Sequence, residues 1–283
     1  MAWQYKAPPE LSDEQYARWQ TLLEARTGIC FLQHKSIMQK GLSTRMKEIG
    51  CDDYEQYFAQ VSEVPGGVVE WTILVDRISV KETSFFREPL SYEAVRAFLK
   101  ERIKASKNKQ DYTLDIWSVG CSTGEEAYSL AIIASEVIDE LSVKLFLGVM
   151  ATDISKTAVE AANRGIYSSR KLDGIPLNIK SKYFVDRSDG SFEIAQSLKE
   201  KLCFVQGNIA QLNRAPKMAM DVIFCQNVLV YFRRDRHDEV LNALVSRLKP
   251  GGLLVVGPGE VVGWQHPQMW RSDNDSVLAF VKH

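Results

Sequence analysis

Residues 117–129 have the sequence WSVGCSTGEEAYS, in which an apolar stretch leads into a loop bounded by two glycines and then into a helical pattern. This order is typical of an open α/β sheet, whose ligands bind at the carboxyl ends of the strands. The loop lacks G-x-G-x-x-G spacing, and Glu125 and Glu126 stand at a helix N-terminus that would otherwise attract a pyrophosphate. The pattern disfavours a dinucleotide and is compatible with a cofactor that has a cationic amino-acid end and a sulfonium, S-adenosylmethionine.

The two glutamates also have an interpretation that needs no ligand. Ser122 with Glu125, or Thr123 with Glu126, fits a capping box, in which side chains satisfy the free N–H groups of a helix start. The two interpretations are compatible if one glutamate caps the helix and the other binds the cofactor.

Further strands follow this unit, alternating with helical segments, and predict a parallel sheet with helices on both faces. Asp153 ends the second strand, where its carboxylate can accept hydrogen bonds from ribose hydroxyls; alternatively it is a helix cap or a turn residue. Asn208 and Ile209 follow the third strand, where they can face an adenine ring. The predicted strands are 114–119, 145–152, 201–206, 222–225 and 253–256, with a last edge or antiparallel strand at 277–281.

The first eighty residues predict a small helical bundle. Ser12, with Gln15 three positions on, is a plausible N-cap, and Gly28 ends that helix. Further helices are predicted over about 36–49, after Asp52-Asp53, after Pro65-Gly66-Gly67, and from Pro89 to about Ala105; 106–111 looks like a surface connection. We expect a helical domain over 1–80 and a catalytic domain over 81–283. An Asp189-Gly190 turn predicts a small β subdomain inserted at about 168–200.

Composition excludes several classes of function. Thirty-five basic and thirty-six acidic side chains give a net charge of -1, so we expect no nucleic-acid partner. No stretch approaches the roughly 18 apolar residues of a membrane span, so we expect a cytoplasmic monomer without membrane insertion. Five scattered cysteines and four histidines predict neither disulfides nor a metal site. Cys225 is interpreted as a core residue and not as a nucleophile.

Over nearly its whole length the chain resembles the chemotaxis protein-glutamate O-methyltransferases, the CheR family. Three segments carry the resemblance. Residues 83–88 (TSFFRE), 122–129 (STGEEAYS) and 224–232 (FCQNVLVYF) are similar to the family's T-x-F-F-R-E, S-T-G-E-E-P-Y-S and F-C-R-N-V-x-I-Y-F segments. The resemblance implies methyl transfer from S-adenosylmethionine to glutamate side chains in the cytoplasmic helical region of methyl-accepting chemoreceptors, leaving S-adenosylhomocysteine. It also implies a Rossmann-like class I methyltransferase domain with an N-terminal helical domain and an inserted antiparallel β subdomain.

The same resemblance implies the residues of the cofactor site, with three departures. Lys81 stands where the family has Asn, Gln226 replaces Arg, and GPGE at 257–260 replaces G-H-S-E, where Pro258 cannot donate a backbone hydrogen bond. These departures indicate a divergent branch, for which a pilus or surface-signalling pathway is a hypothesis. The implied cofactor-binding residues are Lys81, Thr83, Arg87, Glu126, Asp153, Asn208, Ile209, Gln226 and Asn227.

A glutamate carboxylate, with a pKa of about 4.3, is already an anion near neutral pH and needs no general base to attack a sulfonium methyl. The enzyme therefore has mainly to position it. Arg87 is the candidate that holds the carboxylate, and Tyr231 the candidate that donates a hydrogen bond beside the methyl. The plainer alternatives are a surface salt bridge for Arg87 and packing for Tyr231.

Two further segments bear on the receptor. Lys35, Lys40, Arg45 and Lys47 lie on or near the second helix, which in the family meets acidic receptor helices; the alternative is a solvated helix face. The hairpin at 184–192 is shorter than in family members that grip a receptor tail and has one glycine. Recognition through the methylation-region helices alone is therefore expected.

Two other functions stay open at this point. One is methylation of an amine on a small molecule or nucleic acid, although the N-P-P-Y type loop of many amine methylators is absent after residues 222–224. The other is a catalytically silent S-adenosylmethionine-sensing partner, for which Gln226 and Pro258 are the supporting features.

Overall fold

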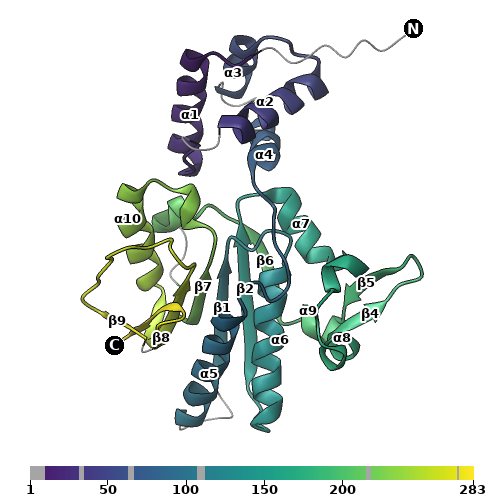
Figure 1. Cartoon of the computed structure of the whole chain (residues 1–283), viewed down its shortest axis with the longest axis vertical. Coiled ribbons are helices and arrows are strands. Elements are labelled where there is room, and N and C mark those ends of the chain that lie inside the picture. Colours follow the sequence, from purple (N-terminus) through teal and green to yellow (C-terminus); the bar gives the residue numbers. More distant parts are fainter. Residues whose placement is uncertain (1–9, 32–34, 63–66, 107–111, 215–217, 273) are drawn as a thin grey trace.

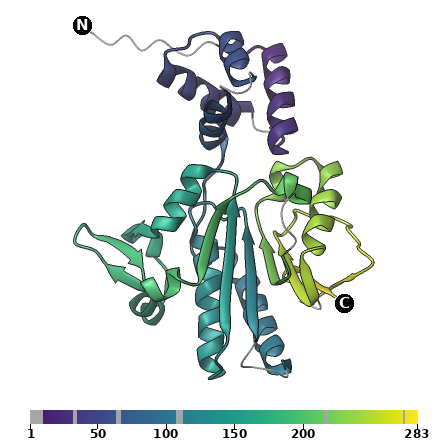
Figure 2. The same ribbon diagram turned by 180° about the vertical axis from the view of Figure 1, so that it is seen from behind.

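The computed structural model describes residues 10–31, 35–62, 67–106, 112–214, 218–272 and 274–283 (Figures 1 and 2). Pro65-Gly66 and all but the first residue of the predicted connection at 106–111 lie outside these ranges. No helix in the described ranges is long and apolar enough to cross a membrane.

Four helices form the N-terminal bundle at the purple end of the chain (Figure 1). The predicted capping box of Ser12 and Gln15 is present, and Gly28 ends the first helix in the left-handed conformation. Trp19 and Leu23 lie in the bundle's apolar core. The helices are α1 (Asp13–Thr27), α2 (Lys35–Ile49), α3 (Tyr54–Ser62) and α4 (Gly67–Ile78).

A seven-stranded sheet forms the centre of the larger part, where five strands run parallel and the last two alternate in direction. The predicted strand at 277–281 is antiparallel, as expected, but it is not an edge strand, because a short strand pairs outside it. In sheet order the strands are β6 (Leu202–Gln206), β2 (Phe146–Asp153), β1 (Thr113–Val119), β7 (Met220–Cys225), β8 (Leu248–Val256), β10 (Leu278–Lys282) and β9 (Met269–Arg271).

Helices cover both faces of this sheet because successive strand side chains point to opposite faces. Leu114 and Ile116 of β1 belong to the apolar cluster of α5 and α6, whereas Trp117 and Val119 belong to the cluster of α10. The fold is thus the predicted Rossmann-like α/β class. Its helices are α5 (Pro89–Ala105), α6 (Glu125–Glu140), α7 (Lys156–Arg164) and α10 (Arg234–Val245).

The inserted unit projects beside α6, away from the seven-stranded sheet (Figures 1 and 2). Its three antiparallel strands have the order β3-β5-β4, and β4 and β5 form the predicted hairpin. The sheet begins at Ile166, slightly before the predicted start at 168. Its elements are β3 (Ile166–Ser168), η1 (Ser169–Leu172), α8 (Leu177–Tyr183), β4 (Phe184–Asp186), β5 (Ser191–Ile194) and α9 (Gln196–Lys199).

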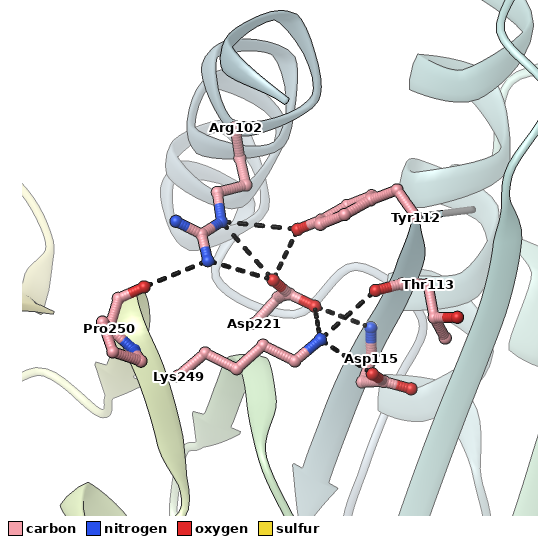
Figure 3. Close-up of polar contacts among 7 residues, drawn as sticks. All are labelled: Arg102, Tyr112, Thr113, Asp115, Asp221, Lys249 and Pro250. Atoms are coloured by element: carbon pink, nitrogen blue, oxygen red, sulfur yellow. Dashed lines mark hydrogen bonds and ion pairs between the residues drawn. The ribbon is translucent and has the colours of Figure 1, made fainter. Parts of the chain in front are cut away.

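A polar network joins α5, β1, β7 and β8 at the amino ends of the central strands (Figure 3). Asp221, which is fully buried, accepts hydrogen bonds from the Tyr112 hydroxyl at 2.5 Å and from Lys249 Nζ at 2.6 Å. Lys249 Nζ also donates to Asp115 at 2.8 Å, and Arg102 Nε lies 3.4 Å from Asp221. Since a buried charge is costly unless it is paired, we assign this network to stability.

Candidate active site

A cavity of about 280 Å³ lies at the carboxyl ends of β1, β2, β6 and β7. Lys81 does not line it, because its Nζ turns toward the first turn of α7 and donates a hydrogen bond to Thr157 Oγ1 at 2.6 Å. Every other predicted site residue is among the lining residues, namely Thr83, Arg87, Glu126, Asp153, Asn208, Ile209, Gln226, Asn227 and Tyr231.

The loop between β1 and α6 forms one wall of the cavity. Gly124, with φ of 98°, is the N-cap of α6 and no side chain caps the helix, so neither predicted capping box forms. Gly120 has φ of 74°, and a Cβ there would lie 2.4 Å from Val228 Cγ2. Only glycine fits both the left-handed backbone and this close approach.

Glu126 projects into the cavity from the first turn of α6. Its Oε1 accepts a hydrogen bond from Ser118 Oγ at 2.7 Å, and it makes no ion pair within the described residues. Burial raises the pKa of this carboxyl to about 8; the Ser118 hydrogen bond opposes the rise, and Glu260 adds to it. The charge of Arg87 also opposes the rise, but Arg87 forms no ion pair with Glu126, so a cation placed beside Glu126 would meet a carboxyl that no described ammonium or guanidinium contacts.

Glu125 points away from the cavity. It is fully buried and forms an ion pair with Lys171 of the inserted unit at 2.9 Å, and its other oxygen accepts a hydrogen bond from Thr123 Oγ1. The two adjacent glutamates thus have different surroundings, which the sequence alone did not separate.

Asp153 is fixed at the end of β2 by two backbone N–H groups. Its Oδ2 accepts from Ser122 N and its Oδ1 from Ser155 N, both at 2.8 Å. Burial raises the pKa of Asp153, and these hydrogen bonds together with the charge of Lys81 oppose the rise. The carboxylate is held at a defined position in the cavity wall.

Arg87 and Thr83 lie on the connection between the two parts of the chain. Arg87 is exposed at the cavity; its one described hydrogen bond, to Glu82 O, is long at 3.5 Å, and it forms no ion pair with a described carboxylate. Phe86 and Glu88, on either side of it, have positive φ of 52° and 60°.

Tyr231 and Asn227 reach the cavity from the segment after β7, which contains the short helix η3 (Leu229–Tyr231). Burial raises the pKa of Tyr231, and the nearby charge of Arg87 opposes the rise. This segment is held by Glu260, which accepts hydrogen bonds from Asn227 N at 3.0 Å and Val230 N at 3.3 Å. Glu260 was not among the predicted site residues, although the GPGE segment that contains it was recognised.

Two amide side chains bond to protein groups. Gln226 Nε2 donates to Ser91 Oγ at 2.7 Å, within the buried interior. Asn208 Nδ2 donates to the carbonyl of Arg26 at the end of α1, at 3.1 Å, so this amide also joins the helical bundle to the sheet.

The helical bundle closes the remaining side of the cavity, which the sequence patterns did not predict. Gly28 marks the point of contact, because a Cβ there would lie 2.7 Å from both Ala210 Cβ and Phe232 Cε1. The only sequence signal was Gly28 itself, which was interpreted solely as a helix end. The bundle residues that line the cavity include Thr27, Ile29, Phe31 and Ile37.

The cavity fits S-adenosylmethionine by its chemistry. It combines a half-buried carboxyl that forms no ion pair with a described residue, a fixed second carboxylate and apolar side chains such as Ile154, Ile209 and Val228. These three surroundings suit, in the same order, a cationic amino-acid end, a ribose and an aromatic base. In the part of the chain that the structure describes, no group of three or more His, Cys, Asp or Glu side chains is placed to hold a metal ion.

Comparison with known proteins identifies the family. Residues 81–276 match the family model described as CheR methyltransferase, SAM binding domain, and residues 14–79 match CheR methyltransferase, all-alpha domain. A chemotaxis protein methyltransferase of Borreliella burgdorferi is 29% identical over 81% of this chain and 81% of its own. Chemotaxis protein methyltransferase 2 of Vibrio cholerae is 29% identical over 88% and 86%.

A third relative is named for a different process. The probable biofilm formation methyltransferase WspC of Pseudomonas aeruginosa is 30% identical over 86% of this chain and 56% of its own length. With both its helical and its catalytic parts matched by the family models, the chain belongs to the CheR methyltransferase family and is an S-adenosylmethionine-dependent methyltransferase.

Proposed function

We propose that this enzyme methylates glutamate side-chain carboxylates in the cytoplasmic helical region of a methyl-accepting chemoreceptor, and so tunes adaptation of the signalling pathway. The observation that carries the proposal is Arg87, an exposed guanidinium at the cavity that forms no ion pair with a described carboxylate. A planar guanidinium matches a carboxylate with two parallel hydrogen bonds. The names of the relatives, chemotaxis protein methyltransferases, support a receptor substrate.

The cofactor is assigned to the side of the cavity formed by the sheet. Glu126 would bind the ammonium of its amino-acid end, and Asp153 the ribose hydroxyls. Ile209 would lie against the base, together with the backbone beside Asn208. Thr83, Gln226 and Asn227 complete the wall, and Lys81 acts from outside it through its charge on Asp153.

The reaction needs no proton transfer by the protein. Bound S-adenosylmethionine supplies a sulfonium-activated methyl group, whose transfer to a carboxylate oxygen gives a methyl ester and S-adenosylhomocysteine without gain or loss of a proton. Arg87 holds the substrate carboxylate at the cavity mouth, and Tyr231 directs its hydroxyl to the same place. The apolar lining excludes water, which strengthens both interactions.

Receptor docking is assigned to α2, with two changes from the sequence expectation. Lys35, the first residue of the helix, already forms an ion pair with Asp13 at 2.6 Å. Arg45 is not available to a receptor, because its guanidinium binds both oxygens of Glu70 at 2.7 Å and Glu48 at 3.0 Å. Lys40 and Lys47 are exposed on this helix. They are the candidates that meet acidic receptor helices. The proposal places this contact in the cytoplasm and takes the enzyme to be a monomer.

Transfer of a labelled methyl group to membranes that contain chemoreceptors tests the proposal. Mild alkali hydrolyses methyl esters to volatile methanol but leaves N-methyl groups intact, so we expect volatile label. Label that resists alkali would instead support an amine acceptor. No transfer, under conditions of proven cofactor binding and with the cognate receptor present, would support a silent sensing protein.

A further inference from the structure

The loop that carries Thr83 and Arg87 is held by the inserted β unit. Lys171 of η1 donates a hydrogen bond from Nζ to the carbonyl oxygen of Thr83 at 2.5 Å. Lys171 and Thr83 are far apart in the chain, and this bond is therefore a direct link between the inserted unit and the cavity wall.

An aromatic contact holds the middle of the same loop. Phe85 packs edge-on against Tyr167 of β3 at 4.9 Å and against Phe184 of β4 at 5.3 Å, measured between ring centroids. The Tyr167 hydroxyl donates to the carbonyl of Thr123 in the cofactor loop at 2.8 Å. The inserted unit thus contacts both the substrate side and the cofactor side of the cavity.

The loop requires such support because its backbone is strained. Phe86 and Glu88 both have positive φ, a conformation that is unfavourable for residues other than glycine because Cβ comes too close to the following carbonyl oxygen. Phe86 N donates to Ser129 Oγ of α6 at 3.0 Å, and the flanking Arg87 has only its long bond to Glu82 O. The position of the Arg87 guanidinium therefore depends on the contacts made by its neighbours.

Lys171 also neutralises Glu125, the fully buried carboxylate at the start of α6. An unpaired charge at that depth is strongly destabilising. The Lys171 ammonium thus links the inserted unit to the strained loop and to the start of α6, where Glu126 follows Glu125.

We propose that Lys171 is a positioning residue for methyl transfer: it holds the Thr83–Glu88 loop so that Arg87 meets the substrate carboxylate, and it thereby couples the inserted β unit to turnover. The proposal rests on the role of Arg87 stated above. A ligand that shifts the inserted unit would act on catalysis through this lysine, without reaching the cavity.

The test compares Lys171→Met with Lys182→Met. Lys182 is a matched control, since it also links the inserted unit to α6, through Glu136 at 2.6 Å and Asp139 at 2.8 Å, but has no described contact with the loop. We expect Lys171→Met to lower kcat roughly tenfold, about 1.4 kcal/mol, with cofactor affinity within threefold of wild type. Lys182→Met should turn over at the wild-type rate, and Lys171→Arg should restore most of the loss.

Hydrogen exchange of residues 84–88 gives a readout that does not depend on activity. The Phe86 amide should exchange faster in Lys171→Met than in Lys182→Met, while the central strands keep their protection. If the unpaired Glu125 prevents folding, the double variant Lys171→Met with Glu125→Gln removes that charge and serves instead. Equal loop exchange and equal kcat in the two lysine variants would overturn the proposal. Absence of alkali-labile methyl transfer by the wild type would refute the proposed function alone, because the exchange comparison still decides whether Lys171 holds the loop.

Discussion

Replacing Glu126 with glutamine should abolish tight cofactor binding and at the same time stabilise the cofactor-free protein. No cation among the described residues forms an ion pair with this half-buried carboxyl, and desolvation raises its pKa to about 8 even though the charge of Arg87 opposes the rise. Because the folded-state pKa lies above that of the unfolded chain, the neutral form fits the fold better than the anion. The bound ammonium needs the anion. Folding therefore favours the neutral form of Glu126, whereas cofactor binding requires its ionised form.

The magnitudes follow from the two pKa values. Ionisation of Glu126 does not lower the free energy of unfolding below the unfolded-state pKa, near 4.5. As pH rises from there toward 8 the free energy of unfolding falls, and at pH 7 the loss is at most about 3 kcal/mol. Glutamine removes this cost, since it is neutral and still accepts the Ser118 hydrogen bond. Between pH 6 and pH 7 the ionised fraction of Glu126 in the free enzyme rises about tenfold, and cofactor affinity should rise with it.

Titration calorimetry with S-adenosylhomocysteine at pH 6 and pH 7 measures the binding side, and urea denaturation of the cofactor-free protein at pH 7 measures the folding side. The wild type should gain about tenfold in affinity and release nearly one proton at pH 7. The variant should bind weakly at both values and be the more stable protein. Wild-type affinity that is equal at pH 6 and pH 7, or a variant less stable than wild type, would refute the reasoning.

Two further outcomes are expected. Asp221→Asn should lower the free energy of unfolding by about 3 kcal/mol, because it leaves the partly buried Lys249 and Arg102 without their buried carboxylate. Cofactor affinity should not change, because the network lies at the opposite ends of the strands from the cavity. Urea denaturation and calorimetry check both, and a large loss of affinity would contradict the prediction. An isolated receptor tail peptide should show no binding to residues 168–200, and a tail-deleted receptor should be methylated at the full rate; micromolar binding at the hairpin by calorimetry would show otherwise.

Much of the fold could be predicted because the central strands are apolar runs bounded by turn residues. Two features could not. β9 is only three residues long, Met269–Arg271, too short to show a periodic pattern, so the strand at 277–281 was also considered an edge strand. β8 begins at Leu248, before the predicted 253, because its pairing with Met220 continues past an irregular register that includes Pro250 and Gly251.

Residues that line the cavity were predictable where a motif and a strand end coincide, as at Glu126 and Asp153. Side-chain arrangements that tertiary contacts decide were not predictable. Lys81 turns toward Thr157, and the amide of Asn208 bonds to the end of α1; neither arrangement leaves a sign in the local sequence. The closing wall from the helical bundle depends on how the bundle packs against the α/β part of the chain, for which Gly28 was the sole local sign in the sequence.

The most direct measurement of the central claim is the position and chemistry of the methyl group on the receptor. Receptor incubated with enzyme and S-adenosylmethionine would be digested and analysed by mass spectrometry before and after mild alkali. We expect a single-methyl mass gain on glutamate side chains of the cytoplasmic helical region, lost after alkali, and absent when Arg87→Ala replaces the wild type. A methyl group on a nitrogen, or one that survives alkali, would contradict the account.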